Sequence, residues 1–386
     1  MKDAFDSQRE VVLIVGGTFD STGTGHSSGL IRKLSSAIRG NLSDTYDVIE
    51  HNGGNYEELS SIMQTEVPRA NFVFWFANVD NTLPKIRNVK EINPKTILVT
   101  SKRNDDYKYS IAELINRALG SKSNLLFEFS KQRDGMFNIR IIDPLGCLWY
   151  DGTNIVDAVV SSIDRLIFLR SITRQSSIHD DDANNLIAKM YHDGKFNSAP
   201  SEQEFINVVH QHADIFHTMV PHVPTERMLG NCSFVPDKYR CTKGFPSARF
   251  GNTVLVSRRN VNKETLSLDD FVPTVLSKDG ELYYYGDNKP SVDTPIQVRL
   301  YSALPNINRM IHSHCYIKGA PFTSVCVPCG GLEEVGEVLR VIDETSNRYQ
   351  SHYKINLIGH GSIVMSKDVD GLRNVEYYAR PIPEVI

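Results

Sequence analysis

The sequence has few cysteines, no long apolar run and no excess of basic residues, and each scarcity excludes a class of protein. Six cysteines in 386 residues are too few for a disulfide framework, which predicts reduced thiols. No apolar run approaches the roughly 18 residues of a membrane span, and the N-terminus has no signal-peptide core. A net charge of −4 gives no basic footprint for nucleic acid. We therefore expect a cytoplasmic protein that binds neither membranes nor nucleic acid.

Length and composition predict two globular domains. A chain of 386 residues is too long for one ordinary core, and 40% apolar and 23% charged residues are typical of folded domains. Residues 173–200 have the composition of a linker and include the acidic run Asp180–Asp182. We therefore expect one domain at 1–172 and a second at 201–386.

Strands and helices alternate in the first of these domains. The predicted strands are 10–18, 46–50, 70–77, 96–100, 124–129 and 137–142, and the predicted helices are 30–39, 56–64, 108–119 and 154–170. This alternation predicts an open, mostly parallel α/β sheet with helices on both faces, which is a Rossmann-like fold. Ligands of such sheets bind at the carboxyl ends of the strands, where this chain has Asp80.

A glycine-rich loop joins the first predicted strand to the first predicted helix. The loop region contains Gly16, Gly17, Thr18, Ser27, Ser28 and Gly29. Main-chain N–H groups and the positive end of a helix favour an anion such as a phosphate there. The loop matches neither the dinucleotide nor the ATP-binding glycine pattern. We predict that these residues and Asp80 bind a nucleotide, whose identity the pattern leaves open.

The same residues resemble a known family. The Gly-Gly-Thr strand end, the segment Gly25-His-Ser-Ser-Gly29 and the strand that leads to Asp80 are similar to the nucleotide-binding domain of phosphopantothenate–cysteine ligases. Gly25 stands where that family has its catalytic asparagine, and glycine has no side-chain amide to stabilise an acyl phosphate. The resemblance implies a nucleotide site without ligase activity. The alternative is a scaffold of this fold that serves assembly.

In the second predicted domain, three histidines form a candidate metal site. The apolar run that begins at Pro305 ends in His312-Ser-His314, and in a strand both imidazoles lie on one face. His360 follows a second strand-like run and lies between two glycines, which allow the backbone to approach a metal closely. Three protein ligands leave one position open, as in a catalytic zinc site. The alternative is that the His-x-His pair is ordinary polar surface or core.

A turn upstream of this strand carries a family resemblance. It reads Lys289-Pro-Ser-Val-Asp293-Thr-Pro, and its aspartate stands 19 residues before His312. With the three histidines, this order resembles the class II aldolase/adducin family over about residues 200–386. The resemblance implies an α/β/α domain with a mainly antiparallel central sheet, a zinc or other divalent cation on the histidines, and a homotetramer. In the family a tyrosine near the C-terminus serves the active site of a neighbouring subunit, a role for Tyr377 or Tyr378.

The resemblance also implies how a substrate is held. The positions that bind the substrate phosphate in the family are occupied by Gly244, Ser257, Arg258, Arg259 and Ser291. Two of these are arginines, which are charged, forked donors. We therefore expect a small anionic substrate, a phosphorylated, sugar-like carbonyl compound.

Two reactions and one non-catalytic role stay open. The cation would stabilise an enediolate while Asp293 moves a proton or binds the cation, which fits an aldolase-type lyase. The turn at 290–295 is similar to that of ribulose-phosphate 4-epimerases, but no acid between Cys315 and Leu332 matches their second carboxylate. The alternative is an adducin-like binding or assembly module. Three histidines and a carboxylate in register favour the enzyme, with the lyase as first choice and the epimerase as second.

Other histidines and cysteines are expected to be structural. His210, His212 and His217 fall on a predicted helix, where the first two point to different sides. Cys326 and Cys329 form a Cys-x-x-Cys pair that we expect to lie in a strand and to pack in the core.

Overall fold

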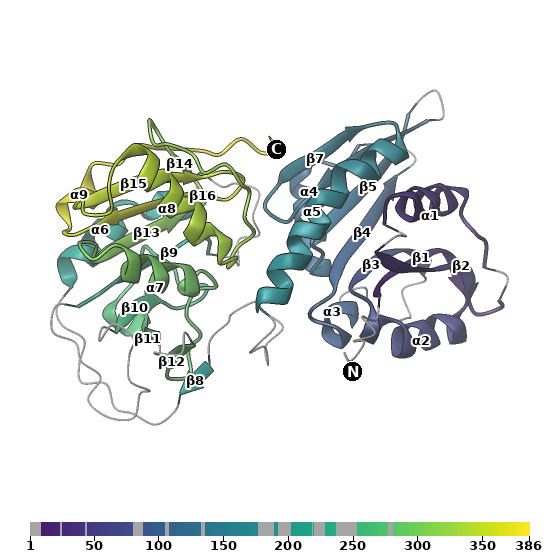
Figure 1. The fold of residues 1–386 in the computed structure, drawn as a ribbon, viewed down its shortest axis with the longest axis horizontal. Coiled ribbons are helices and arrows are strands. Elements are labelled where there is room, and N and C mark those ends of the chain that lie inside the picture. Colours follow the sequence, from purple (N-terminus) through teal and green to yellow (C-terminus); the bar gives the residue numbers. More distant parts are fainter. Residues whose placement is uncertain are drawn as a thin grey trace, which may run out of the picture. The chain divides into compact units, whose positions relative to one another are not determined.

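A computed structural model shows two compact units. It describes residues 9–23, 25–42, 45–79, 88–104, 108–132, 136–176, 189–191, 202–217, 219, 228–236, 253–276 and 281–386. One unit comprises Met1–Gln175 with Ile382–Ile386, and the other comprises Ser176–Pro381 (Figure 1). Over the described ranges, no helix is both long and apolar enough to span a bilayer.

The first unit is built on an eight-stranded sheet of order β18-β7-β6-β5-β4-β3-β1-β2. Its strands are β1 (Glu10–Asp20), β2 (Tyr46–Asn55), β3 (Phe72–Val79), β4 (Ile97–Asn104), β5 (Leu125–Lys131), β6 (Phe137–Ile142), β7 (Cys147–Gly152) and β18 (Glu384–Val385). Strands β1 to β5 are parallel, and β6 is antiparallel to both neighbours. This confirms the predicted open, mostly parallel sheet. The strand order reverses at β1, so the carboxyl ends of β1 and β3 flank the position where such sheets bind ligands.

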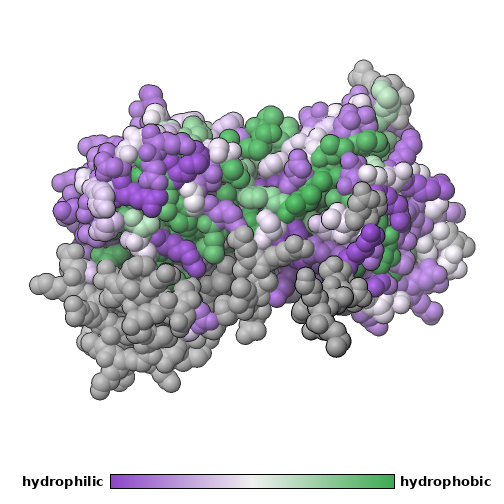
Figure 2. Space-filling model, in the orientation of Figure 1, coloured by the Kyte–Doolittle hydropathy of each residue, from purple (hydrophilic) through white to green (hydrophobic). Residues whose placement is uncertain are grey.

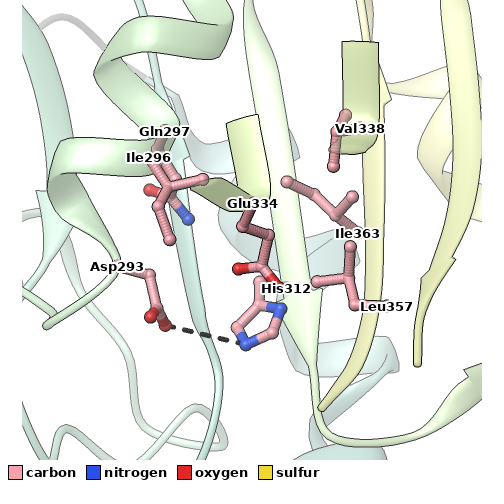
Figure 3. A pocket seen from close by; sticks show the side chains of 8 residues that line it. All are labelled: Asp293, Ile296, Gln297, His312, Glu334, Val338, Leu357 and Ile363. Atoms are coloured by element: carbon pink, nitrogen blue, oxygen red, sulfur yellow. Dashed lines mark ion pairs between the residues drawn. The ribbon is translucent and has the colours of Figure 1, made fainter. Parts of the chain in front are cut away.

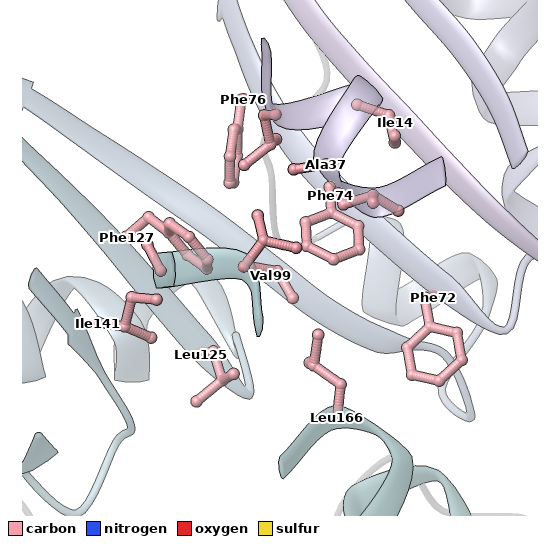
Figure 4. Packing of buried hydrophobic residues seen from close by; sticks show 14 of the residues in the cluster. Ile14, Ala37, Phe72, Phe74, Phe76, Val99, Leu125, Phe127, Ile141 and Leu166 are labelled. Atoms are coloured by element: carbon pink, nitrogen blue, oxygen red, sulfur yellow. The ribbon is translucent and has the colours of Figure 1, made fainter. Parts of the chain in front are cut away.

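Helices cover both faces of this sheet. They are α1 (Gly29–Leu42), α2 (Tyr56–Thr65), α3 (Asn88–Ile92), α4 (Ile111–Ser121) and α5 (Ile155–Ser176), with a 3₁₀ turn at Val67–Arg69. In β1, Val12 and Ile14 pack with α1 and α5, whereas Leu13 and Val15 pack with α2. This alternation explains why the strand is apolar at every position. Aromatic rings, among them Phe74 and Phe127, fill the layer under α1 and α5 (Figure 4).

Helix α5 is apolar on its outer side as well. Val156 is 47% exposed and Val160 is 49% exposed. Apolar side chains gather over the part of this unit where Figure 1 places α5 (Figure 2). The helix therefore leaves an apolar strip outside the core of the first unit.

The end of the chain returns to the first unit. Strand β18 pairs in parallel with β7, and Ile382 packs with Ile115 of α4. The expected second domain, 201–386, therefore differs from the compact second unit, which ends at Pro381. Five residues are too short a segment for sequence periodicity to assign to a distant sheet.

The second unit has an eight-stranded, mainly antiparallel sheet of order β15-β16-β13-β9-β10-β11-β12-β8. Its strands are β8 (Lys189–Tyr191), β9 (Asn231–Phe234), β10 (Val254–Ser257), β11 (Phe271–Leu276), β12 (Leu282–Tyr285), β13 (Arg309–Ser313), β15 (His352–Leu357) and β16 (Gly361–Ser366). A small ribbon pairs β14 (Tyr316–Ile317) with β17 (Tyr377–Tyr378). Only the β12–β8 pair among these described strands of the large sheet is parallel.

Helices pack on the second sheet in the predicted α/β/α manner. They are α6 (Gln203–Gln211), α7 (Thr294–Ala303), α8 (Glu333–Thr345) and α9 (Asp370–Arg373), with 3₁₀ turns at Ala213–Phe216 and Leu268–Asp270. Helices α7 and α8 share one apolar core with β13, β15 and β16. Phe205 of α6 instead packs against Phe234 and Phe271. The shared core fixes α7 and α8 beside the strands that carry the histidines.

Candidate functional site

Three buried imidazoles meet at the end of β13. His312 lies in β13, His314 follows it, and His360 lies in the turn between β15 and β16. The ring centroids of the three pairs are separated by 5.3, 4.7 and 5.1 Å. One nitrogen of each ring lies within 4.8 Å of the others, and all three residues are buried. The structure thus brings together the three histidines that the sequence selects.

A glycine makes this meeting possible. Strands β13 and β16 are antiparallel, with Ser313 opposite Ser362. A Cβ at Gly361 would lie 2.0 Å from the Ser313 carbonyl oxygen and 2.7 Å from the His314 Cα. The glycine therefore lets the two strands approach each other closely.

Hydrogen bonds fix the orientation of two of the rings. The His312 Nδ1 lies 3.0 Å from the Ser362 carbonyl oxygen, and the His360 Nδ1 lies 3.0 Å from Glu334 Oε1. Because both oxygens are acceptors, each Nδ1 donates a hydrogen bond, and the Nε2 of neutral His312 keeps its lone pair. The His312 Nε2 is buried and has no hydrogen-bond partner in the described part of the chain. A buried lone pair of this kind suits a cation.

Protonation of the rings follows their surroundings. Burial, and then the charge of His360, lower the pKa of His312 to about 4. Burial, and then His360 and His312, lower the pKa of His314 well below its usual value. Burial also acts to lower the pKa of His360, but Cys329 and Glu334 outweigh it and raise that pKa well above its usual value. At neutral pH, His312 and His314 are therefore neutral, which is the form that binds metal ions.

Asp293 lies beside His312 at the start of α7. Its Oδ2 is 3.6 Å from the His312 Nε2 and accepts a hydrogen bond of 2.8 Å from the Asn231 side chain. Its Oδ1 accepts one of 3.0 Å from the Gly330 main-chain N–H. The main-chain carbonyl of Asp293 begins the helix, whereas its side chain makes no capping bond and faces His312 (Figure 3). The carboxylate is therefore held toward the imidazoles.

Sequence reasoning missed two residues of this site, Cys329 and Glu334. The Cys329 Sγ lies 3.2 Å from the His360 Nε2, and Glu334 bonds to the other nitrogen of the same ring. The expected strand through the Cys-x-x-Cys pair is absent from the described segment 321–332, because Pro328 and two glycines oppose a strand. Cys326 is buried, as expected. One feature of the sequence could have revealed both residues: two glutamates, Glu333 and Glu334, directly follow Cys329-Gly-Gly-Leu.

The predicted substrate residues separate into two groups. Arg258 pairs with Asp270 at 2.7 Å, and the Ser257 and Ser291 hydroxyls take part in hydrogen bonds with Cys232 and Asn231. The Arg259 Nε and Nη2 are buried and unpaired among the described residues. Burial lowers the pKa of Arg259, while Tyr284 and Asp293 act to raise it. Gly244 lies outside the described residues.

The two C-terminal tyrosines lie in β17. The Tyr377 ring contacts His212 at 5.6 Å between centroids, and Tyr378 contacts Tyr316 at 5.8 Å. Burial raises the pKa of Tyr377. The structure describes a single chain, so a role for either tyrosine in a neighbouring subunit stays a prediction.

Hydrogen bonds to two strands, β2 and β4, hold the predicted nucleotide loop. The Ser28 N–H donates to the Asn52 side chain at 2.8 Å, and the Arg103 Nη2 donates to the Ser28 hydroxyl at 3.3 Å. Gly17 has φ +76°, and a Cβ there would lie 2.6 Å from the Gly53 nitrogen. The remaining predicted positions are Gly16 and Thr18 in β1, exposed Ser27, and Gly29 at the start of α1. Asp80 lies outside the described residues.

Comparison with known proteins supports the predicted resemblance of the second half. Residues 210–321 match the family model of the Class II Aldolase and Adducin N-terminal domain. This segment includes Asp293, His312 and His314, but not His360. No curated protein matches the chain. The family match supports an aldolase-family function in general terms.

Several solved structures are similar to parts of the chain. The DNA/pantothenate metabolism flavoprotein from Streptococcus pneumoniae is 13% identical, with a TM-score of 0.35 over 42% of this chain and 99% of its own. YgbL from Klebsiella pneumoniae, named for aldolases, epimerases and decarboxylases, is 13% identical, with a TM-score of 0.28 over 46% of this chain and 95% of its own. An aldolase II superfamily protein from Pseudomonas syringae is 11% identical, with a TM-score of 0.26 over 45% of this chain and 70% of its own. At these TM-scores the likenesses assign no chemistry.

We expect Glu337 to make the loop that carries Cys329 sensitive to acid. Its Oε2 accepts hydrogen bonds from the Ser324 N–H, the Ser324 hydroxyl and the Val325 N–H. Burial opposes the shift, but Arg340 and Ser324 lower the pKa of Glu337 to about 2. The stabilisation is therefore complete above the ordinary pKa of glutamate, about 4.5, and is lost as the pH falls toward about 2.

Glu337→Gln should lower the free energy of unfolding of the second unit by about 1–3 kcal/mol at pH 7 and by a smaller amount at pH 3. Urea unfolding at both pH values measures this. The control is Glu344→Gln, because Glu344 is an exposed partner of the same arginine, Arg340. Equal losses at the two pH values would contradict the assignment.

Proposed function

We propose that this protein is a metal-dependent enzyme of the aldolase type, which acts on a small anionic, phosphorylated, sugar-like carbonyl compound. The observation that carries this proposal is the meeting of three buried imidazoles beside the Asp293 carboxylate. The family match over 210–321 supports the same class. Lyase chemistry is the first choice and epimerisation the second.

The residues fit a divalent cation. Imidazole nitrogens suit zinc, and the buried His312 Nε2, which has no hydrogen-bond partner among the described residues, is open to a cation. His312, His314 and His360 would hold the ion, and Glu334 would orient His360 from the far side of the ring. Bound there, the ion supplies Lewis-acid polarisation of a substrate carbonyl.

Asp293 is proposed to move the proton. Its two hydrogen bonds, from Asn231 and Gly330, hold the carboxylate in one orientation beside the imidazoles. It would accept a proton from a substrate hydroxyl and return it to the product carbon. Glu334 is committed to His360, so it does not supply the free second acid that the epimerase choice requires.

Arg259 is proposed to bind the anionic group of the substrate. Its guanidinium has two buried, unpaired N–H groups, and Asp293 lies close enough to affect its charge. Arg258 is a weaker choice because Asp270 already occupies it. The proposal retains a homotetramer, from the family resemblance. It also retains a nucleotide-like ligand at the loop of the first unit, where the guanidinium of Arg103 lies beside the Ser28 hydroxyl.

His312→Ala and His360→Ala should each remove the metal, because two imidazoles bind a divalent cation far more weakly than three. Metal analysis of the purified protein should give near one ion per chain for wild type and near zero for both variants. Circular dichroism checks that the variants stay folded. The control is His210→Ala, because His210 lies in α6, outside the three-histidine group, and bonds to the Leu266 carbonyl oxygen. Wild-type metal content in both site variants would refute the metal site.

Asp293→Asn should lower turnover by roughly 10²-fold or more, because the amide keeps the shape of the carboxylate and cannot accept the proton. Turnover is measured on the best substrate from a panel of phosphorylated ketoses and aldehydes, and metal content is measured in parallel. An unchanged rate with the metal retained would show that Asp293 has only a structural role at the start of α7.

Arg259→Gln should weaken binding of inorganic phosphate to the metal-loaded protein by about 10-fold or more, which is the effect of a lost charged hydrogen bond. Calorimetric titration with inorganic phosphate measures this. Arg258→Gln is the matched control, because its neighbouring guanidinium is paired with Asp270. A larger loss in Arg258→Gln than in Arg259→Gln would reverse the assignment.

A further inference from the structure

We propose that Cys329 is a further ligand of the metal site, and that its thiolate occupies the coordination position that the three imidazoles leave open. This inference rests on the proposed function, since it requires a cation on His312, His314 and His360. It changes the resting state of the site from open to closed.

The position of the sulfur atom is the first observation. The Cys329 Sγ lies 3.2 Å from the His360 Nε2, whereas Glu334 bonds to the other nitrogen of that ring. Two ligands of one tetrahedral zinc ion, at about 2.1 Å for nitrogen and about 2.3 Å for sulfur, are about 3.5 Å apart. The thiol therefore already stands at the distance of a second ligand of the same ion.

The surroundings of the sulfur atom are the second observation. Ligand atoms of Asp293, Cys329 and His360 lie within 4.8 Å of one another, as do those of the three histidines. His312 is 3% exposed, and its Nε2 has no hydrogen-bond partner in the described structure, although it lies 3.6 Å from Asp293 Oδ2. His360 is common to both groups, so it links the thiol to the other two imidazoles. Figure 3 shows that His312, Asp293 and Glu334 line one pocket.

A thiolate ligand has consequences that imidazoles alone do not have. Thiolates favour zinc, cobalt(II) and cadmium over magnesium and manganese. The thiol loses its proton to solvent when the ion binds. A substrate oxygen must displace the sulfur before it can reach the ion.

The same contacts offer a competing role for the cysteine. Cys329, His360 and Glu334 are joined in the order thiol, imidazole, carboxylate, which is the order of a thiol nucleophile with its base and orienting acid. A nucleophile would stay reactive in the metal-loaded protein. A metal ligand would be shielded there, so alkylation distinguishes the two roles.

Cobalt(II) is the probe that tests the ligand. Full-length protein is freed of metal, loaded with cobalt(II) and examined for the near-ultraviolet band of sulfur-to-cobalt charge transfer. Wild type should show the band, and Cys329→Ala should bind cobalt at least 10-fold more weakly and lack it. Cys326→Ala is the matched control from the same loop and should keep the band. X-ray absorption of the zinc form should show one sulfur at about 2.3 Å.

The outcomes distinguish the thiolate ligand from the three-histidine site. Cobalt binding to wild type without the band, or with a band that survives Cys329→Ala, overturns the thiolate ligand and leaves the three-histidine site standing. Failure of wild type to bind cobalt overturns both. Iodoacetamide labelling of wild type requires no variant: Cys329 should be labelled in the metal-free protein and protected in the cobalt form. Rapid labelling in the cobalt form overturns the ligand in favour of the nucleophile.

Discussion

The close approach of β13 and β16 is the constraint on which the site depends. Only glycine at 361 leaves room for the Ser313 carbonyl, and this approach places the turn that carries His360 beside His314. It also places the Ser362 carbonyl against the His312 ring. Buried polar atoms are costly without partners, so the backbone of β16 both stabilises the imidazole and selects the nitrogen that stays unprotonated.

Helix α8 connects this strand pair to the loop that carries Cys329. Glu334 bonds to His360, and Glu337, one turn later on the same face, bonds to Ser324 and Val325. One helix therefore holds an imidazole at its first turn and the start of the loop at its second. The position of Cys329 relative to His360 depends on two carboxylates three residues apart.

The sequence was informative where one element carries the pattern. The strand that ends in His312-Ser-His314, the turn with Asp293, and the continuous apolar run of β1 follow from local periodicity and spacing, and the structure has all three. Glu334 and Cys329 were not predicted, because each acts through a contact with His360, which is distant from both in the chain. No local pattern records such a contact.

The two arginines show the same limit within one dipeptide. As sequence, Arg258 and Arg259 are equivalent charged donors. In the structure, the main chain after β10 directs Arg258 to Asp270, while Arg259 has buried N–H groups without partners among the described residues. The difference arises from the 3₁₀ turn at Leu268–Asp270, which supplies the carboxylate for Arg258 alone.

Asp293 and Cys329 form a group with His360, which also belongs to the three-histidine group, so the two side chains would compete for the one position that a tetrahedral ion on the imidazoles leaves open. Asp293 already accepts hydrogen bonds from Asn231 and Gly330, whereas the Cys329 thiol bonds to His360, which the ion itself would engage. Binding of the sulfur therefore disrupts fewer contacts, and the carboxylate stays available for proton transfer. Because Gly330 directly follows Cys329, a single peptide unit connects the proposed sulfur ligand to the N–H that holds Asp293.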